Sequence, residues 1–185
     1  MVHEGGICPQ RRIGREAKLA GSNTKRAIGI DPGLAATGFA IVETTGRGGR
    51  ACEWGGIKTD SRDPLPSRLC RLFDAVGGIV EKWLPDLMVM EDVFMVERFP
   101  RAAIQLGEVR GVICLAAWKQ NIPIAEIKPT EVKRALTGNG WAAKDQIEKS
   151  LRRMLGIEGR IMPHHASDAM ALALMGLSRR GWLRW

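Results

Sequence analysis

Two acidic side chains stand where buried strands are expected to end. Asp31 directly follows the apolar run Ala27–Ile30, and Glu91 follows Leu87–Met90. A carboxylate in such a place is costly unless it is hydrogen-bonded or binds a cation. Two carboxylates at neighbouring strand ends repel each other unless a divalent cation lies between them. The pair therefore predicts a cation site. Taken alone, the alternative for Asp31 is an ordinary turn aspartate in Asp-Pro-Gly, and the alternative for Glu91 is a solvated strand terminus.

A histidine and an aspartate form the third candidate element of this site. His165 and Asp168 lie three residues apart near the start of an apolar helix, so both project from one helix face. An imidazole and a carboxylate at this spacing can bind one metal ion. Helix capping by Asp168 or His164, with a surface histidine, is the alternative. Together with the two strand-end acids, the pair would supply the oxygen-rich environment that Mg²⁺ prefers.

Basic side chains lie close in sequence to these acids. They flank the loop Gly138–Gly140 or follow Phe94, and they are Lys128, Lys133, Arg134, Lys144, Arg98 and Arg101. A run of charges is usually a solvated face. Because these basic residues lie beside candidate metal ligands in a chain of net charge +8, we expect some of them to contact phosphates.

The composition favours one globular domain with a polyanionic partner. The chain has 185 residues, of which 45% are hydrophobic and 26% charged, and its net charge is +8. Nucleic acid is the first candidate partner and an anionic membrane surface the second. No stretch reaches the roughly 18 apolar residues of a spanning helix, so we expect a soluble protein. With nucleic acid as the favoured partner, no membrane partner is expected. Four isolated cysteines and no secretory signal predict a cytoplasmic location.

The chain divides into an arm, a main domain and a tail. Residues 1–24 lack sustained periodicity and are interpreted as a flexible basic arm, with a functionless extension as the alternative. Residues 25–178 form the main domain, and residues 179–185 form a basic tail.

The main domain is predicted to have an α/β fold, with a mixed sheet and helices on its faces. Apolar runs predict strands at 27–30, 37–42, 51–58, 87–90 and 122–127, the first three forming an antiparallel meander with a turn at 46–49. Helical spacing predicts helices from 66 to before Pro85, and at 101–119, 130–136, 144–155 and 166–177. Gly77 and Gly78 mark a weak point in the first of these helices.

Several segments together resemble the RuvC family of crossover-junction endodeoxyribonucleases, the bacterial Holliday-junction resolvases. They occur in order between residues 25 and 177: Ile28–Gly33 with Thr37 and Gly38, Gly56–Thr59 with Leu65–Leu69, Glu91–Met95, Leu106–Gly111, Pro129 with Val132 and Lys133, Lys144, and His165–Ala169. The match is specific as a set, whereas Asp-Pro-Gly alone would be weak.

This resemblance implies a ribonuclease H-like fold with a mixed five-stranded sheet and helices on both faces. It implies a homodimer that resolves four-way DNA junctions in recombination and repair, by paired metal-dependent nicks that leave 5′-phosphates, with branch-migration proteins as further partners. The implied ligands of two Mg²⁺ ions are Asp31, Glu91, His165 and Asp168. Lys144 would stabilise charge in the transition state, and DNA would be contacted by Phe94 as an aromatic wedge, Arg98, Arg101, Lys133, Arg134 and Lys144.

The histidine of this set departs from many family members, which have an aspartate at the position of His165. A neutral imidazole removes one negative charge and suits Mn²⁺ better than Mg²⁺, so we expect Mn²⁺ to support activity. The competing functions are another ribonuclease H-like nuclease, acting on RNA–DNA hybrids or branched DNA, and a non-catalytic junction-binding module. An ATPase with a strand followed by Asp-x-Gly would need a second domain, which 185 residues do not accommodate.

Overall fold

The computed structural model describes residues 24–46, 48–92 and 100–184. Within these ranges five strands form one sheet in the order β3-β2-β1-β4-β5. The strands are β1 (Arg26–Asp31), β2 (Ala36–Thr45), β3 (Gly48–Lys58), β4 (Leu87–Glu91) and β5 (Ile124–Ile127). β1, β2 and β3 pair antiparallel, whereas β4 runs parallel to β1 and to β5. The predicted meander and mixed sheet are confirmed.

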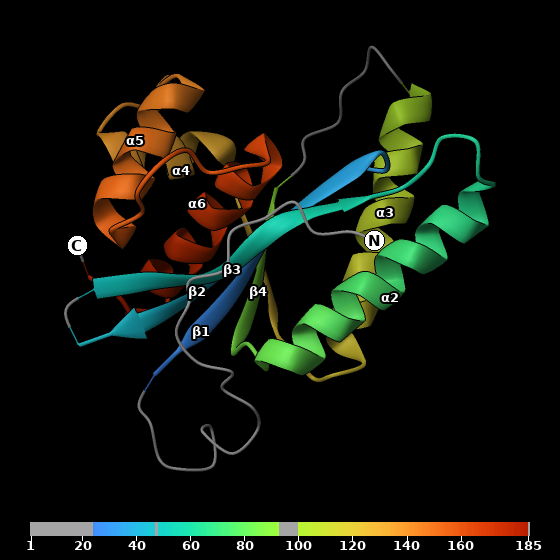
Figure 1. Cartoon of the computed structure of the whole chain (residues 1–185), viewed down its shortest axis with the longest axis horizontal. Helices are drawn as coiled ribbons and strands as arrows, with labels where there is room; N and C mark the ends of the chain where they lie inside the picture. The colour runs from blue at the N-terminus through green and yellow to red at the C-terminus, as the bar shows by residue number, and fades with distance from the viewer. Residues whose placement is uncertain (1–23, 47, 93–99, 185) are drawn as a thin grey trace.

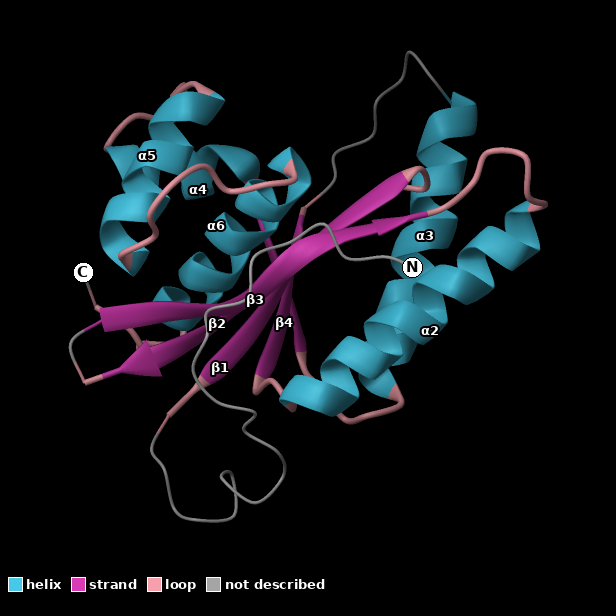
Figure 2. Ribbon diagram, viewed as in Figure 1, coloured by secondary structure: helices cyan, strands magenta, loops and turns pink. Residues whose placement is uncertain are grey.

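Helices cover both faces of this sheet, as predicted. They are α2 (Leu65–Trp83), α3 (Pro100–Trp118), α4 (Pro129–Thr137), α5 (Lys144–Leu155) and α6 (His164–Arg179). α2 and α3 lie on one face, and α4, α5 and α6 lie on the other (Figure 1, Figure 2). Each face has its own apolar core. Of the predicted arm, residues 1–23 lie outside the description, as do Arg47 of the predicted turn and Trp185 of the predicted tail.

The side chains of β1 alternate between the two cores. Ile28 and Ile30 are fully buried among residues of α2 and α3, whereas Ala27 packs on the opposite side with residues of α6. Successive side chains of a strand point to opposite faces of a sheet, so a strand covered on both faces is apolar throughout. This is why the continuous run Ala27–Ile30 predicts a central strand.

The first helix, α2, is continuous through Gly77 and Gly78, where its sequence indicates a weak point. Each glycine costs about 1 kcal/mol relative to alanine in a helix. The buried stripe of α2, which includes Val76 and Val80, offsets this cost because the stripe packs into the core. α2 ends at Trp83 and is capped by Leu84, which takes a left-handed conformation (φ 46°) and donates its N–H to the carbonyl of Val80 at 2.8 Å.

The last helix, α6, lies against the sheet at backbone distance. A Cβ atom on Gly29 of β1 would lie 1.8 Å from the carbonyl oxygen of Ala169, and one on Gly38 of β2 would lie 2.2 Å from that of His165. Only glycine leaves room for this approach. Because Gly38 pairs with Asp31 across the β1–β2 ladder, α6 begins directly over the end of β1.

Some boundaries differ from the predicted ones by one or two residues. α6 begins at His164 rather than Ala166, directly after Pro163, so His165 lies in the first helical turn. β5 begins at Ile124 because Pro123 has no N–H to donate, although its carbonyl accepts the N–H of Met88 at 2.9 Å. None of the helices in the described ranges combines the length and apolar character needed to span a membrane.

Candidate active site

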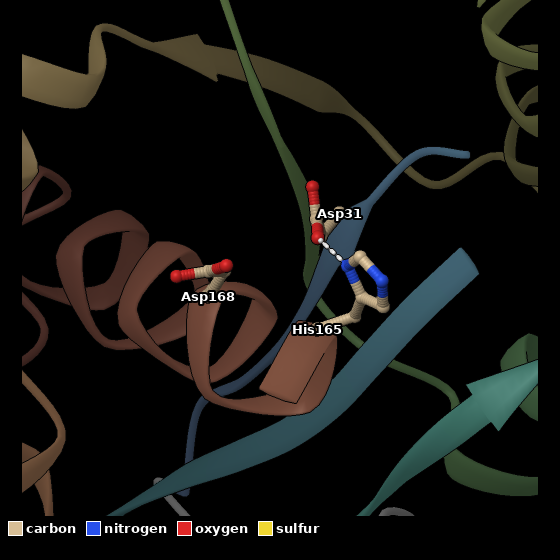
Figure 3. A group of neighbouring side chains, drawn as sticks. All are labelled: Asp31, His165 and Asp168. Carbon is tan, nitrogen blue, oxygen red and sulfur yellow. Dashed lines mark hydrogen bonds and ion pairs between the residues drawn. The ribbon is translucent and has the colours of Figure 1, made fainter. Parts of the chain in front are cut away.

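Asp31 and His165 meet at the end of β1. The Nδ1 atom of His165 lies 2.8 Å from Oδ2 of Asp31, within hydrogen-bond distance, although 134 residues separate them in sequence. Figure 3 shows the imidazole of α6 pointing at the carboxylate of β1. The side chain of Asp31 is 18% exposed and that of His165 is 51% exposed, so the pair is accessible from solvent.

Asp168 completes a group of three potential metal ligands. One ligand atom from each of Asp31, His165 and Asp168 lies within 4.8 Å of the others. Asp168 is half-buried and extends from the same end of α6 as His165 (Figure 3). Carboxylate oxygens and an imidazole nitrogen at this spacing suit a divalent cation such as Mg²⁺ or Mn²⁺. The structure thus brings together three of the four predicted ligands.

Glu91, the fourth predicted ligand, lies at the same edge of the sheet. It ends β4, which is the parallel neighbour of β1. Burial raises the pKa of the Glu91 carboxyl, and the charges of Asp31 and Asp168 raise it further. Glu91 is therefore within electrostatic reach of the cluster, although it is outside the group whose ligand atoms lie within 4.8 Å of one another.

The acids of the cluster repel one another. Burial raises the pKa of Asp31, and the charge of Asp168 acts in the same direction, while the hydrogen bond from His165 opposes both. The ionised carboxylates are therefore in a setting that disfavours their negative charge. A divalent cation would remove this penalty, so the residues present fit a metal ion.

Lys144 brings a positive charge to the cluster. It is the first residue of α5, and its Nζ donates to Oδ2 of Asp168 at 2.8 Å. This hydrogen bond raises the pKa of Lys144, which keeps the ammonium charged. The lysine side chain is 77% exposed, so it is free to reach a bound phosphate as well.

The contacts bear on two of the alternative roles, helix capping and the turn aspartate. Pro163 is the N-cap of α6, and no side chain caps this helix, so the capping interpretation of His164 and Asp168 is wrong. In the turn after β1, the hydroxyl of Thr37 donates to the carbonyl of Gly33 at 2.8 Å and accepts the N–H of Gly33. The carboxylate of Asp31 instead contacts His165.

The other predicted DNA-contacting residues are distributed over two helices. Lys133 and Arg134 belong to α4, and Arg101 is exposed in the first turn of α3. In the described part of the chain, Lys144 is the predicted basic residue that forms an ion pair with the acidic cluster. Phe94 and Arg98 lie outside the described residues.

The sequence reasoning missed the role of Arg110. From α3, its guanidinium donates to the backbone carbonyl of Glu91 at 2.6 Å and also pairs with the carboxylate of Glu126 on β5. It thereby ties the ends of β4 and β5 together and positions Glu91. The available signal was an arginine next to the core residue Val109, in a helix whose other charged residues are Arg101 and Glu108.

Comparisons with known proteins are consistent across sequence and structure. Residues 27–176 match the family described as crossover junction endodeoxyribonuclease RuvC. The sequence is 40% identical to the protein of that name from Rhodopirellula baltica over 151 residues, which is 80% of this chain and 84% of the relative. It is 35% identical to the one from Brevibacillus brevis, over 85% of this chain and 95% of the relative.

Two solved structures of Thermus thermophilus RuvC share the fold. The structure of the protein itself has a TM-score of 0.77 at 29% identity, and the complex with Holliday junction substrate has 0.79 at 28% identity. Each match covers 86% of this chain and 98% of the other. The predicted ribonuclease H-like fold is confirmed.

Proposed function

The chain belongs to the RuvC family of crossover junction endodeoxyribonucleases, and from this we propose that it resolves four-way DNA junctions during recombination and repair. It is a metal-dependent endonuclease with Holliday-junction DNA as its substrate. The observation that carries the proposal is the convergence of Asp31, His165 and Asp168 within 4.8 Å. The Thermus relative of the same fold was solved with a Holliday junction bound, which supports the substrate.

The proposed metal ligands are Asp31, Glu91, His165 and Asp168. We assign two Mg²⁺ ions to the site, with Mn²⁺ as an effective substitute. Bound divalent cations would increase the acidity of the attacking water and neutralise charge on the scissile phosphate. Asp31 is central because its carboxylate lies beside His165 and is in the electrostatic field of Asp168. Arg110 keeps Glu91 in place through the backbone of β4.

Lys144 is proposed to act on the phosphate. Its ammonium is charged, exposed and anchored next to the acids by Asp168. From this position it would donate hydrogen bonds to a phosphate oxygen on which negative charge develops. Lys133, Arg134 and Arg101 are proposed to contact the DNA backbone further from the cluster, and Phe94 and Arg98 remain predicted DNA contacts.

A homodimer is supported by one face of α3. Ile104, Leu115 and Trp118 expose 65%, 52% and 72% of their surfaces. Their spacing of eleven and three residues places them on one side of the helix. Exposed apolar side chains gathered in this way mark interaction surfaces. A twofold axis at this face would present two active sites to opposing strands and would produce paired nicks with 5′-phosphate ends.

A cytoplasmic location is supported by the cysteines. Cys52, Cys70 and Cys114 are free thiols. Free thiols are typical of a reducing compartment, which supports the cytoplasm.

The proposal is tested by comparing substrates. Wild-type protein with Mg²⁺ or Mn²⁺ should cut a labelled four-way junction symmetrically and leave a linear duplex and an RNA–DNA hybrid intact. Asp31→Asn should reduce the cleavage rate by at least about a hundredfold, because a metal ligand supplies several kcal/mol to the transition state. Its junction affinity should be retained. Preferential cutting of the hybrid would favour the other nuclease function, and junction binding without cleavage under any divalent cation would favour the binding module.

A further inference from the structure

Trp141 is an exposed aromatic residue at the border of the active site. It lies between α4 and α5, and 88% of its surface is accessible. Lys144, three residues later, reaches Asp168 at 2.8 Å. Three residues of chain span at most about 11 Å, so the backbone of Trp141 is within that distance of the backbone of Lys144. A large ring left in water there contributes nothing to the core, and its position three residues before Lys144 is what needs a functional explanation.

The loop that carries Trp141 is held by its own hydrogen bonds. α4 ends at Gly138, which has a left-handed conformation (φ 76°). The N–H of Trp141 donates to Oδ1 of Asn139 at 2.9 Å, and the N–H of Ala142 donates to the carbonyl of Asn139 at 3.2 Å. Ala142 itself is buried in the core beneath α6. The backbone therefore presents the ring from a fixed position, which lowers the entropic cost of a contact.

Basic residues flank the loop that carries this ring. The exposed ammonium of Lys144 lies on the α5 side. On the α4 side, Arg134 is exposed, and a Cβ on Gly140 would lie 4.0 Å from its Nε atom, so the guanidinium is next to the loop. Asp145 is the exposed acid that follows Lys144. An exposed aromatic ring on a loop flanked by two basic residues matches a nucleic-acid strand, whose bases stack on rings and whose phosphates pair with cations.

We propose that Trp141 stacks on an unpaired or unstacked base near the scissile phosphate and thereby favours junctions over intact duplex. The inference rests on the proposed function. In a continuous duplex each base is covered on both faces by its neighbours. A protruding ring finds a free base face only where the strand is opened, as at the centre of a four-way junction. Trp141 therefore contributes affinity that an intact duplex cannot use.

Three substitutions separate stacking from other effects of the ring. Trp141→Phe keeps an aromatic face, Trp141→Leu keeps only an apolar side chain, and Trp141→Ala removes both. Each variant is titrated against a four-way junction and a linear duplex of the same sequence in EDTA, and each is assayed for junction cleavage with Mg²⁺. We expect Trp141→Ala and Trp141→Leu to lose about tenfold in junction affinity, the loss typical of one stacked base, and Trp141→Phe to lose less than about threefold. Duplex affinity should change by less than about twofold in all three.

The outcomes distinguish this inference from the proposed function. Junction affinity of Trp141→Ala or Trp141→Leu within about twofold of wild type would overturn the stacking role, and an equal loss on duplex would overturn the selectivity. Wild-type protein that fails to cut the junction would instead refute the proposed function. Because the ring is exposed, all variants should unfold at the wild-type temperature, which thermal denaturation checks.

Discussion

The imidazole of His165 sets the charge of the ligand cluster. A carboxylate at this position would add a third negative charge beside Asp31 and Asp168, where burial and then the charge of Asp168 already raise the pKa of Asp31. The imidazole instead forms a 2.8 Å hydrogen bond with Asp31. Nitrogen donors shift the preference of a site from Mg²⁺ toward transition metals such as Mn²⁺.

Replacing the imidazole should therefore change the metal preference. We expect His165→Asp to lower the ratio of Mn²⁺-supported to Mg²⁺-supported junction cleavage by at least about threefold, because an all-oxygen site favours Mg²⁺. Initial rates at matched cation concentrations measure this ratio. An unchanged ratio would show that His165 does not contribute to metal choice.

Glu91 should make the metal-free protein less stable near neutral pH. Its folded-state pKa is raised by burial and by Asp31 and Asp168, so ionisation of Glu91 favours the unfolded chain. The penalty is absent below the unfolded pKa of a glutamate, about 4.3, and is fully present above the raised folded pKa. In EDTA at pH 7.5, Glu91→Gln should therefore unfold a few degrees above wild type, an advantage that disappears near pH 4.

Added divalent cation provides the control for this experiment. Mg²⁺ should raise the unfolding temperature of wild type more than that of Glu91→Gln, since a ligand that binds only the folded state stabilises it. A lower unfolding temperature for Glu91→Gln in EDTA at pH 7.5 would contradict the electrostatic account.

Single residues were predicted where a local pattern marks them. Asp31 and Glu91 follow apolar runs, and His165 and Asp168 share a helix face, so their types and spacing indicate them as candidates. The sequence marks Lys144 as one of several basic residues flanking the loop Gly138–Gly140, and the family resemblance implies its catalytic role. Its ion pair with Asp168 joins segments 24 residues apart. Only the packing of α5 against α6 determines that contact.

At the level of elements, α6 is positioned by glycines on the strands beneath it. The missing side chains of Gly29 and Gly38 allow the helix backbone to touch the sheet, and this contact places His165 over Asp31. The sequence shows the glycines but not what approaches them, because helix and strands are separated by more than a hundred residues. The continuity of α2 through Gly77 was likewise decided by core packing rather than by helix propensity.

Two glycine substitutions should have opposite effects on stability. Gly29→Ala places a methyl group 1.8 Å from the carbonyl of Ala169, so we expect it to lower the free energy of unfolding by about 1–3 kcal/mol or more. Gly78→Ala has open space around it in α2 and should raise the free energy of unfolding by about 0.5–1 kcal/mol. Urea denaturation measures both. Equal effects of the two variants would show that α6 does not depend on close contact with β1.

At the scale of the whole molecule, net charge and dimer symmetry both affect DNA binding. Each chain carries a net charge of +8, so a dimer brings twice that charge to the DNA, and binding should weaken steeply with added salt. The exposed apolar face of α3, formed by Ile104, Leu115 and Trp118, is the proposed contact between the two copies.

Disrupting this face should separate the two nicks. We expect Trp118→Glu to be monomeric by light scattering at micromolar concentration. Burying an unpaired charge in an apolar interface costs free energy, which would weaken the association of the two copies. Junction cleavage by this variant should produce single, uncoupled nicks, whereas Trp118→Phe should remain dimeric with paired nicks. A Trp118→Glu protein that is still dimeric would place the interface elsewhere.

The most direct test of the account is to locate bound metal. Crystals of the protein soaked in Mn²⁺ should show anomalous scattering peaks at the end of β1, with ligand atoms of Asp31, His165 and Asp168 about 2.0–2.4 Å away. Asp31→Asn crystals treated identically should show weakened or absent peaks. Peaks confined to other parts of the surface, with these three side chains unliganded, would contradict the central claim that the chain folds to bind catalytic metal here.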